Sequence, residues 1–169
     1  MIIAISGLTG SGKNTLGELL AKKLGYHLVC PTFKDLAEKE GISLMEFQKK
    51  AEKDPNIDRK FDQLLKEQTK NGNCVVTTWL GPWIVEADIR IRVFAPDDIR
   101  ATRVAKRDDI SKEDAAAHIK ERDEGNRSRY KKLYGIDIYE TSKFDACLNS
   151  SIYSPKELAD ISLFIIKKK

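Results

Sequence analysis

The sequence predicts an α/β domain in which helices flank a central parallel sheet. The first observation is the order strand, glycine turn, helix, strand over residues 2–30, because this βαβ order joins strands that run in the same direction. The second is that short apolar runs alternate with stretches of helical periodicity along the rest of the chain. A length of 169 residues suits one compact domain, so we expect a single domain over residues 1–169.

The first βαβ unit is defined by apolar runs and glycines. Ile2–Ser6 is a short apolar run typical of a strand buried on both faces. Glycines at positions 7, 10 and 12 then interrupt regular structure. From Lys13 the leucines have helical spacing, and Gly25 is a suitable helix terminator. The apolar run His27–Cys30 predicts the second strand.

Residues 33–70 are rich in charge and carry apolar side chains at helical intervals. This pattern predicts two or three helices, interrupted at Gly41 and Pro55. Ser43 followed by Glu46 forms the pattern of a capping box, which predicts a helix start at this point.

The second half of the chain predicts further strands and helices. Arg90 and Arg92 alternate with isoleucine and valine, which favours a strand with one more solvated face. The expected strands are Asn73–Thr78, Ala87–Phe94 and Phe144–Leu148, and the expected helices are Asp97–Asp108, Ser111–Tyr134 and the segment from Pro155 to the terminus.

The segment after the first strand reads GLTGSGKNT and matches the pattern G-x-x-x-x-G-K. Its glycines let the backbone curl so that N–H groups point at an anion, and the following helix directs its positive end to the same place. Lys13 can reach the β- and γ-phosphates from the first turn. A glycine turn that binds no phosphate would require neither this lysine nor the helix that follows. The expected phosphate-binding P-loop comprises Gly7, Leu8, Thr9, Gly10, Ser11, Gly12, Lys13, Asn14 and Thr15.

Asn14 stands where this motif usually has Ser or Thr, whose hydroxyl would bind Mg²⁺. An asparagine can supply a carbonyl oxygen instead, or the ion can be held through water, with Thr15 contributing its hydroxyl. A carboxylate that holds the ion through water is expected at Asp35, Asp137 or Asp145, and the sequence does not rank these three.

Two pairs of arginines are candidates for phosphate binding. Arg103 and Arg107 are four residues apart, and Arg122 and Arg129 are seven apart, so each pair shares one face of a helix. Phosphoryl transfer requires the phosphates to be aligned and their charge neutralised, and a planar guanidinium can hold two oxygens at once. The alternative is a solvated basic helix, which explains one arginine better than a paired set.

Several segments resemble the archaeal-type cytidylate kinases, members of the nucleoside monophosphate (NMP) kinase family with a P-loop NTPase fold. The segments are residues 41–47, 54–58, 103–107, 121–123, 127–130 and 134–137, which read GISLMEF, DPNID, RVAKR, ERD, RSRY and YGID. The resemblance covers nearly the whole chain in order.

The resemblance implies a three-layer P-loop kinase fold. Its parts would be a core (residues 1–30, 71–102 and 112–169), a helical NMP-binding insertion (about 33–70) and a short lid (about 103–111). It also implies ATP-dependent phosphorylation of CMP or dCMP, with Mg²⁺ as cofactor. Arg103 and Arg107 would cover the ATP, and Arg122 and Arg129 would bridge the transferring phosphoryl group and the acceptor phosphate.

The sequence departs from the family on the acceptor side. Thr77-Thr78-Trp79 replaces an acidic residue, a glycine and an arginine, and Lys34 replaces an arginine after Phe33. We expect Lys34, Thr78 and Trp79 to contact the acceptor, together with Arg122 and Arg129. Trp79 and Trp83 can each stack on a base or pack in the core. A kinase with another small acceptor, or a non-catalytic P-loop protein that binds nucleotide, remains the alternative.

The composition limits the kinds of binding partner that we expect. The net charge is +4, from 30 basic and 26 acidic residues, and this slight excess does not favour nucleic acid. The three cysteines are widely spaced and form no metal-binding pattern. We expect a cytoplasmic monomer that binds small nucleotides, with neither a membrane nor a nucleic acid as partner.

Overall fold

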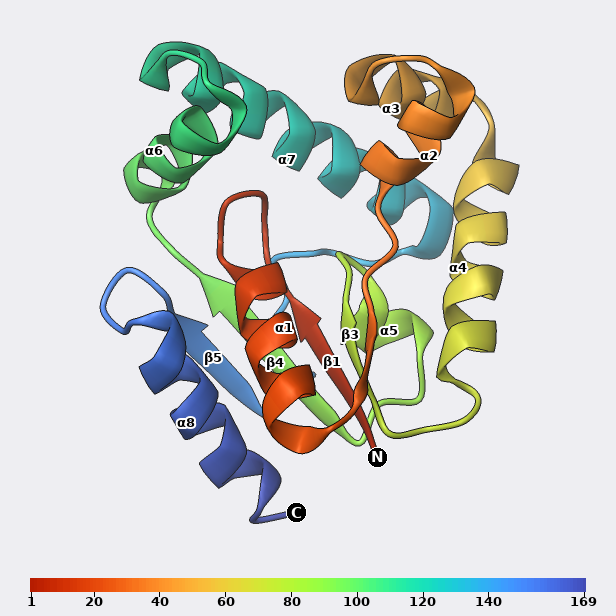
Figure 1. Ribbon diagram of the computed structural model, residues 1–169. Helices are drawn as coiled ribbons and strands as arrows, with labels where there is room; N and C mark the ends of the chain where they lie inside the picture. Colours follow the sequence, from red (N-terminus) through yellow and green to blue (C-terminus); the bar gives the residue numbers. More distant parts are fainter.

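The computed structural model describes all 169 residues and contains one five-stranded sheet in the order β2-β3-β1-β4-β5 (Figure 1). Every neighbouring pair of strands is parallel, which confirms the predicted α/β class. In the centre, Ile3 of β1 lies opposite Val75 of β3 and Ile89 of β4. The strands are β1 (Ile2–Ser6), β2 (His27–Val29), β3 (Cys74–Thr77), β4 (Ile89–Phe94) and β5 (Ala146–Asn149).

Eight helices connect and cover these strands, and three of them lie in the stretch 33–70. Gly25 ends α1 in the left-handed conformation, and the predicted capping box of Ser43 and Glu46 begins α3. The helices are α1 (Lys13–Leu24), α2 (Phe33–Glu40), α3 (Leu44–Lys53), α4 (Pro55–Thr69), α5 (Gly81–Ile84), α6 (Asp97–Asp108), α7 (Lys112–Tyr134) and α8 (Pro155–Ile166). None of them is long and apolar enough to cross a membrane.

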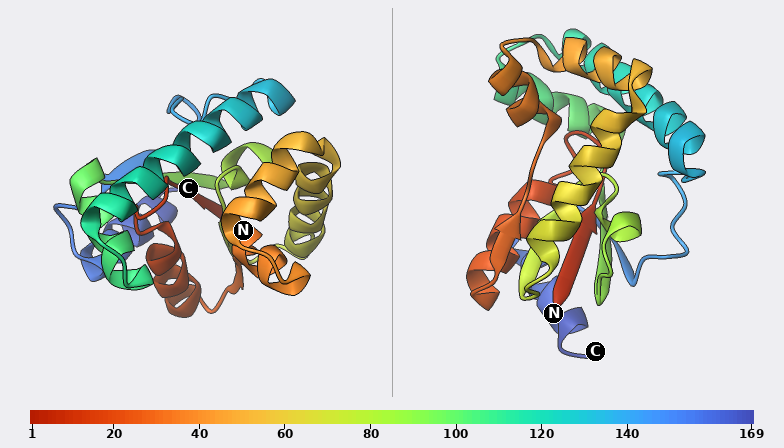
Figure 2. Two further views of the ribbon diagram at one scale, coloured as in Figure 1. Left: turned by 90° about the horizontal axis from the view of Figure 1, so that it is seen from above. Right: turned by 90° about the vertical axis from the view of Figure 1, so that its right-hand side faces the viewer.

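The core lies on both faces of the sheet. On one face, Ile3 and Ile5 pack with Leu16 and Leu20 of α1 and Leu158 of α8. On the other face a second cluster joins the sheet to α4 and to the segment around α5, and Figure 2 shows α1 and α5 on opposite sides of β1. Because both faces of β1 are covered, its side chains are apolar from Ile2 to Ile5.

The ends of the strands position the site. In Figure 1, α2 and α3 on one side and α6 and α7 on the other stand above the carboxyl ends of the strands, next to the loop that follows β1. Both chain termini lie at the opposite end of the sheet. The carboxyl edge of an open parallel sheet is where ligands bind in α/β proteins, so the functional site is expected at this edge.

Two features differ from the sequence-based expectation. Arg92 was expected on a solvated face of its strand, but it is 7% exposed and its guanidinium donates to the carbonyl oxygen of Ile138. The segment after α7 covers this face of the sheet, and periodicity within β4 does not reveal such a cover. The four-residue helix α5 was not expected, because one turn is too short to show a period.

Candidate active site

The glycine loop between β1 and α1 has a backbone that other residues would strain. Gly10 and Gly12 have φ values of 78° and 90°, in the left-handed region that favours glycine. A Cβ at Gly7 would lie 2.4 Å from the carbonyl oxygen of Val93. The loop therefore packs directly on β4 and leads into the first turn of α1, as the phosphate-binding motif requires.

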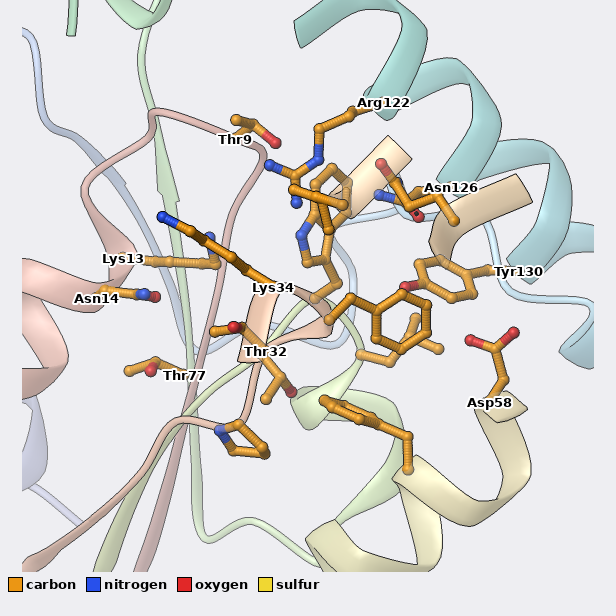
Figure 3. A pocket seen from close by; sticks show the side chains of 18 of the residues that line it. Thr9, Lys13, Asn14, Thr32, Lys34, Asp58, Thr77, Arg122, Asn126 and Tyr130 are labelled. Atoms are coloured by element: carbon orange, nitrogen blue, oxygen red, sulfur yellow. Dashed lines mark hydrogen bonds between the residues drawn. The ribbon is translucent and has the colours of Figure 1, made fainter. Parts of the chain in front are cut away.

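Lys13 points from the first turn of α1 into a cleft at the end of the sheet (Figure 3). Burial, reinforced by the nearby charge of Arg122, lowers the pKa of its ammonium group to about 8. The ammonium forms no ion pair within the chain. An unpaired, half-buried cation at the end of a P-loop is suited to bind an anionic ligand.

The cleft has a volume of about 240 Å³ and unites two groups of side chains. The P-loop and β3 form one wall with residues such as Asn14 and Thr77, and α7 contributes Arg122 from above. The inserted helices form the facing wall. The lining residues of these walls include Thr9, Gly10, Lys13, Pro31, Thr32, Phe33, Lys34, Leu44, Gln48, Asp58, Phe61, Asp62, Thr78, Trp79, Leu80, Arg107, Asn126 and Tyr130.

The four predicted arginines occupy different positions. Arg122 and Arg107 line the cleft. Burial, followed by the charge of Arg107, lowers the pKa of Arg122, and a guanidinium stays protonated at neutral pH despite such a shift. Arg107 is more exposed and pairs with Asp108 at 2.6 Å. Both side chains thus present positive charge to the space next to Lys13.

Arg103 and Arg129 lie outside the cleft lining. Arg103 donates to the carbonyl oxygen of Gly10 at 3.2 Å and to that of Ser150 at 2.6 Å, so it ties the P-loop to the segment after β5. Arg129 is 8% exposed, and its Nε lies 3.1 Å from Oδ2 of Asp58. Its guanidinium also stacks on the ring of Phe33, 5.1 Å from the centroid.

The predicted acceptor residues Lys34, Thr78 and Trp79 all line the cleft. The hydroxyl of Thr78 accepts from the backbone N–H of Gly81 at 2.9 Å, so it also fixes the start of α5. Trp83, in contrast, packs edge-on against Phe144 with 5.3 Å between the ring centroids. Of the two tryptophans, only Trp79 is placed to touch a ligand.

Sequence reasoning missed a buried ion pair beside the P-loop. Arg100 and Asp123 are 5% exposed at their side chains and lie 2.6 Å apart. Arg100 also donates to the carbonyl oxygen of Thr9 at 3.0 Å. This pair joins α6 and α7 to the P-loop, and it places Arg122, the neighbour of Asp123, over the cleft. In the sequence, Arg100 looks like one more cation of a basic helix.

Sequence reasoning also did not identify the acidic residues that line the cleft. Asp58 and Asp62 of α4 are 3% and 9% exposed and both line the cleft. Burial raises the pKa of Asp62, whose carboxylate accepts a hydrogen bond from the hydroxyl of Tyr134. Two acids four residues apart were the available signal, since they share one face of a helix, but nothing in the pattern marked that face as buried.

Burial raises the pKa of Asp58 from 3.8 to about 6, against the opposing charge of Arg129. Between about pH 4 and pH 6 the folded chain therefore holds a proton at Asp58 that the unfolded chain has released. This tighter proton binding stabilises the folded chain at low pH, and the stabilisation is lost as the pH rises through about 6. We expect the wild type to lose about 3 kcal/mol relative to Asp58→Asn between about pH 4 and pH 7. Urea unfolding at both pH values measures this, and parallel pH profiles of the two proteins would contradict it.

The oxygens around the P-loop are suited to a hard cation. Oδ1 of Asn14 and Oγ1 of Thr77 are buried, lack hydrogen-bond partners and belong to residues of the cleft. Such oxygens are ligands of the kind that Mg²⁺ prefers. The structure contains no group of three or more His, Cys, Asp or Glu that could hold a metal ion, so phosphate oxygens and water would complete the coordination.

The other candidate metal residues lie elsewhere. Asp35 accepts from the backbone N–H of Thr32 at the start of α2, Asp137 pairs with Arg127, and Asp145 pairs with Lys169. None of these three carboxylates lines the cleft. Thr15 is exposed on α1 and is also absent from the lining.

A P-loop at the end of the first strand, facing a cleft whose far wall is a set of inserted helices, defines a P-loop kinase of small molecules. The same fold occurs in the shikimate kinase from Acinetobacter baumannii, with a TM-score of 0.61 at 15% identity over 99% of this chain and 93% of that one. At this identity the likeness concerns the fold alone.

Comparison of sequences defines the family. The model of the cytidylate kinase-like family matches residues 2–152. The cytidylate kinase of Pyrococcus horikoshii is 45% identical over 159 residues, which cover 92% of this chain and 83% of the relative. That of Pyrobaculum islandicum is 45% identical over 167 residues, covering 96% and 91%. The chain belongs to the cytidylate kinase-like family, and the resemblance inferred from its motifs is confirmed.

Proposed function

We propose that this chain transfers the γ-phosphoryl group of ATP to CMP or dCMP, giving ADP and the corresponding nucleoside diphosphate. The observation that carries the proposal is the continuity of the cleft. Lys13 of the P-loop lines the same space as Arg122, Lys34 and Thr78. Donor and acceptor phosphates therefore have room to meet within one chain, which also supports a monomeric enzyme.

The residues of the cleft have different roles in phosphoryl transfer. The P-loop amides and Lys13 bind the β- and γ-phosphates of ATP, and Arg122 neutralises charge that develops on the transferring group. Arg107 approaches the same phosphates from α6. Arg103 holds the P-loop backbone in place. Residues 33–70 act as the insertion that binds the acceptor, and residues 103–111, which span the end of α6 and the turn into α7, act as the lid.

Mg²⁺ would be held by Oδ1 of Asn14, by Oγ1 of Thr77 and by phosphate oxygens. When bound, the ion would supply charge neutralisation for the phosphates. An amide at position 14 replaces the usual hydroxyl in this role with another neutral oxygen. The acceptor side offers one cation, Lys34, and an aromatic face, Trp79.

Purified protein incubated with ATP, Mg²⁺ and a panel of nucleoside monophosphates tests this function. We expect ADP formation with CMP and dCMP at rates well above those with AMP, GMP and UMP. Turnover of another nucleotide with CMP inert would reassign the acceptor. Tight ATP binding without turnover of any acceptor would indicate a non-catalytic nucleotide-binding protein.

Arg122→Ala is expected to lower kcat by about 100-fold, because it removes a half-buried cation next to the transferring group. Arg127→Ala is the matched control on the same helix. Arg127 is exposed and pairs with Asp137 away from the cleft, so kcat should change less than about twofold. Steady-state kinetics with CMP measures both variants. Equal losses of kcat would indicate that Arg122 is only one cation of a solvated basic helix.

A further inference from the structure

The cleft is polarised along its length. Its P-loop end carries the cations Lys13 and Arg122, whereas its far end carries carboxylate and amide side chains (Figure 3). The far group comprises Asp58 and Asp62 of α4, Gln48 of α3 and Asn126 of α7, which are 3%, 9%, 5% and 2% exposed. An acceptor whose phosphate lies near Arg122 would direct its opposite end toward these groups.

Two acceptor atoms at this far end lack hydrogen bonds. They are Oδ2 of Asp58 and Oε1 of Gln48, and both are buried. Arg129 lies 3.1 Å from Oδ2 of Asp58, where it balances the charge without making a directional hydrogen bond. Buried acceptors without donors are costly and uncommon in folded proteins. Their position in the cleft indicates that a ligand supplies the missing donors.

Aromatic side chains lie along the same cleft. Phe33, Phe61, Trp79 and Tyr130 contribute to its lining. Flat rings of this kind favour a planar ligand such as a nucleobase, which can stack on them while its polar edge reaches hydrogen-bonding groups. The far end of the cleft is therefore suited to recognise the polar edge of a base by hydrogen bonds.

We propose that the Asp58 carboxylate, aided by the Gln48 side chain, accepts a hydrogen bond from the 4-amino group of cytosine and thereby selects cytosine over uracil. This inference rests on the proposed function, whose acceptor site it specifies. Cytosine presents an amine at position 4, whereas uracil presents a carbonyl oxygen. An ionised carboxylate can only accept, so it binds the amine and repels the carbonyl oxygen.

Arg129 is the positioning residue in this arrangement. It is fixed between the ring of Phe33 and the carboxylate of Asp58, and its charge favours the ionised carboxylate. The residues that recognise cytosine, Asp58 and Gln48, thereby lie on the inserted helices. They do not lie after β3, where Thr77-Thr78-Trp79 carries no charge. The absence of charges there is then compatible with specificity for CMP.

The test compares kcat/KM for CMP and UMP in the wild type and in Asp58→Asn. The asparagine amide can donate to the uracil oxygen, so the CMP-to-UMP ratio should fall by about 10- to 100-fold. A purely structural role for Asp58 would lower both values together and leave the ratio unchanged. Asp62→Asn is the comparison on the same helix, and a fall in the ratio there but not in Asp58→Asn would overturn the assignment.

A second measurement needs no variant. The wild type is assayed with a CMP analogue that carries hydrogen in place of the 4-amino group, and kcat/KM should fall by about 10- to 100-fold relative to CMP. Equal use of both compounds would overturn the inference. If the wild type phosphorylates no nucleoside monophosphate, the proposed function itself fails. If it phosphorylates CMP and Asp58→Asn keeps the wild-type ratio, only the role of Asp58 fails.

Discussion

Replacing Lys13 with methionine is expected to reduce kcat by about 1,000-fold. The ammonium of Lys13 is half-buried and points into the cleft, and it has no carboxylate partner in the chain. Its charge is therefore available to oxygens that become more negative during transfer, and such an interaction in a desolvated site is worth several kcal/mol. Methionine keeps the length and apolar character of the stem, so the change isolates the charge.

Single-turnover kinetics with ATP and CMP measures the step directly. Lys22→Met provides the control, because Lys22 is exposed at the last turn of the same helix, and its kcat should remain within about twofold of the wild type. A Lys13→Met variant that retains more than about a tenth of the wild-type rate would show that this ammonium does not stabilise the transition state.

Replacing Asp123 with alanine is expected to destabilise the chain by about 3 kcal/mol, because it leaves the buried Arg100 with only the exposed carboxylate of Asp97, 2.6 Å away, as a partner. Both side chains are 5% exposed and lie 2.6 Å apart. For a chain of this size the loss corresponds to a fall in Tm of about 10 °C. Thermal unfolding followed by circular dichroism measures it. The same variant should weaken ATP binding, because Arg100 also holds the Thr9 carbonyl.

Two comparisons make this prediction specific. Asp160→Ala breaks the exposed pair of Lys23 and Asp160 at 2.9 Å and should cost less than about 1 kcal/mol. The double variant Arg100→Met/Asp123→Leu removes both charges and should recover most of the stability lost in Asp123→Ala. If Asp123→Ala were as stable as Asp160→Ala, the buried pair would not hold α6 and α7 to the P-loop.

Much of the fold could be predicted because its signals are local. The P-loop has a fixed spacing of glycines and lysine, and the helices of residues 33–70 begin at caps that the sequence shows, such as Ser43 with Glu46. The order of strands and helices follows from apolar runs separated by such signals. These features depend on neighbours within a few residues, so tertiary packing did not change them.

The site was harder to predict because it depends on which helix faces are buried against one another. Arg122 and Arg129 are separated by two turns of one helix, yet only Arg122 reaches the cleft, while Arg129 lies behind it against Asp58. Arg100 looked like a surface cation and is a buried partner of Asp123. A helix that is polar on several faces gives no period that marks its buried side.

Transfer of label from ATP to CMP tests the central claim most directly. The protein is incubated with CMP, Mg²⁺ and ATP labelled in the γ-phosphate, and the products are separated by chromatography. We expect the label in the β-phosphate of CDP, formed in equal amount to ADP. Label in inorganic phosphate with CMP unchanged, or ATP that stays intact in the presence of CMP, would contradict the claim that this cleft is the site of a cytidylate kinase.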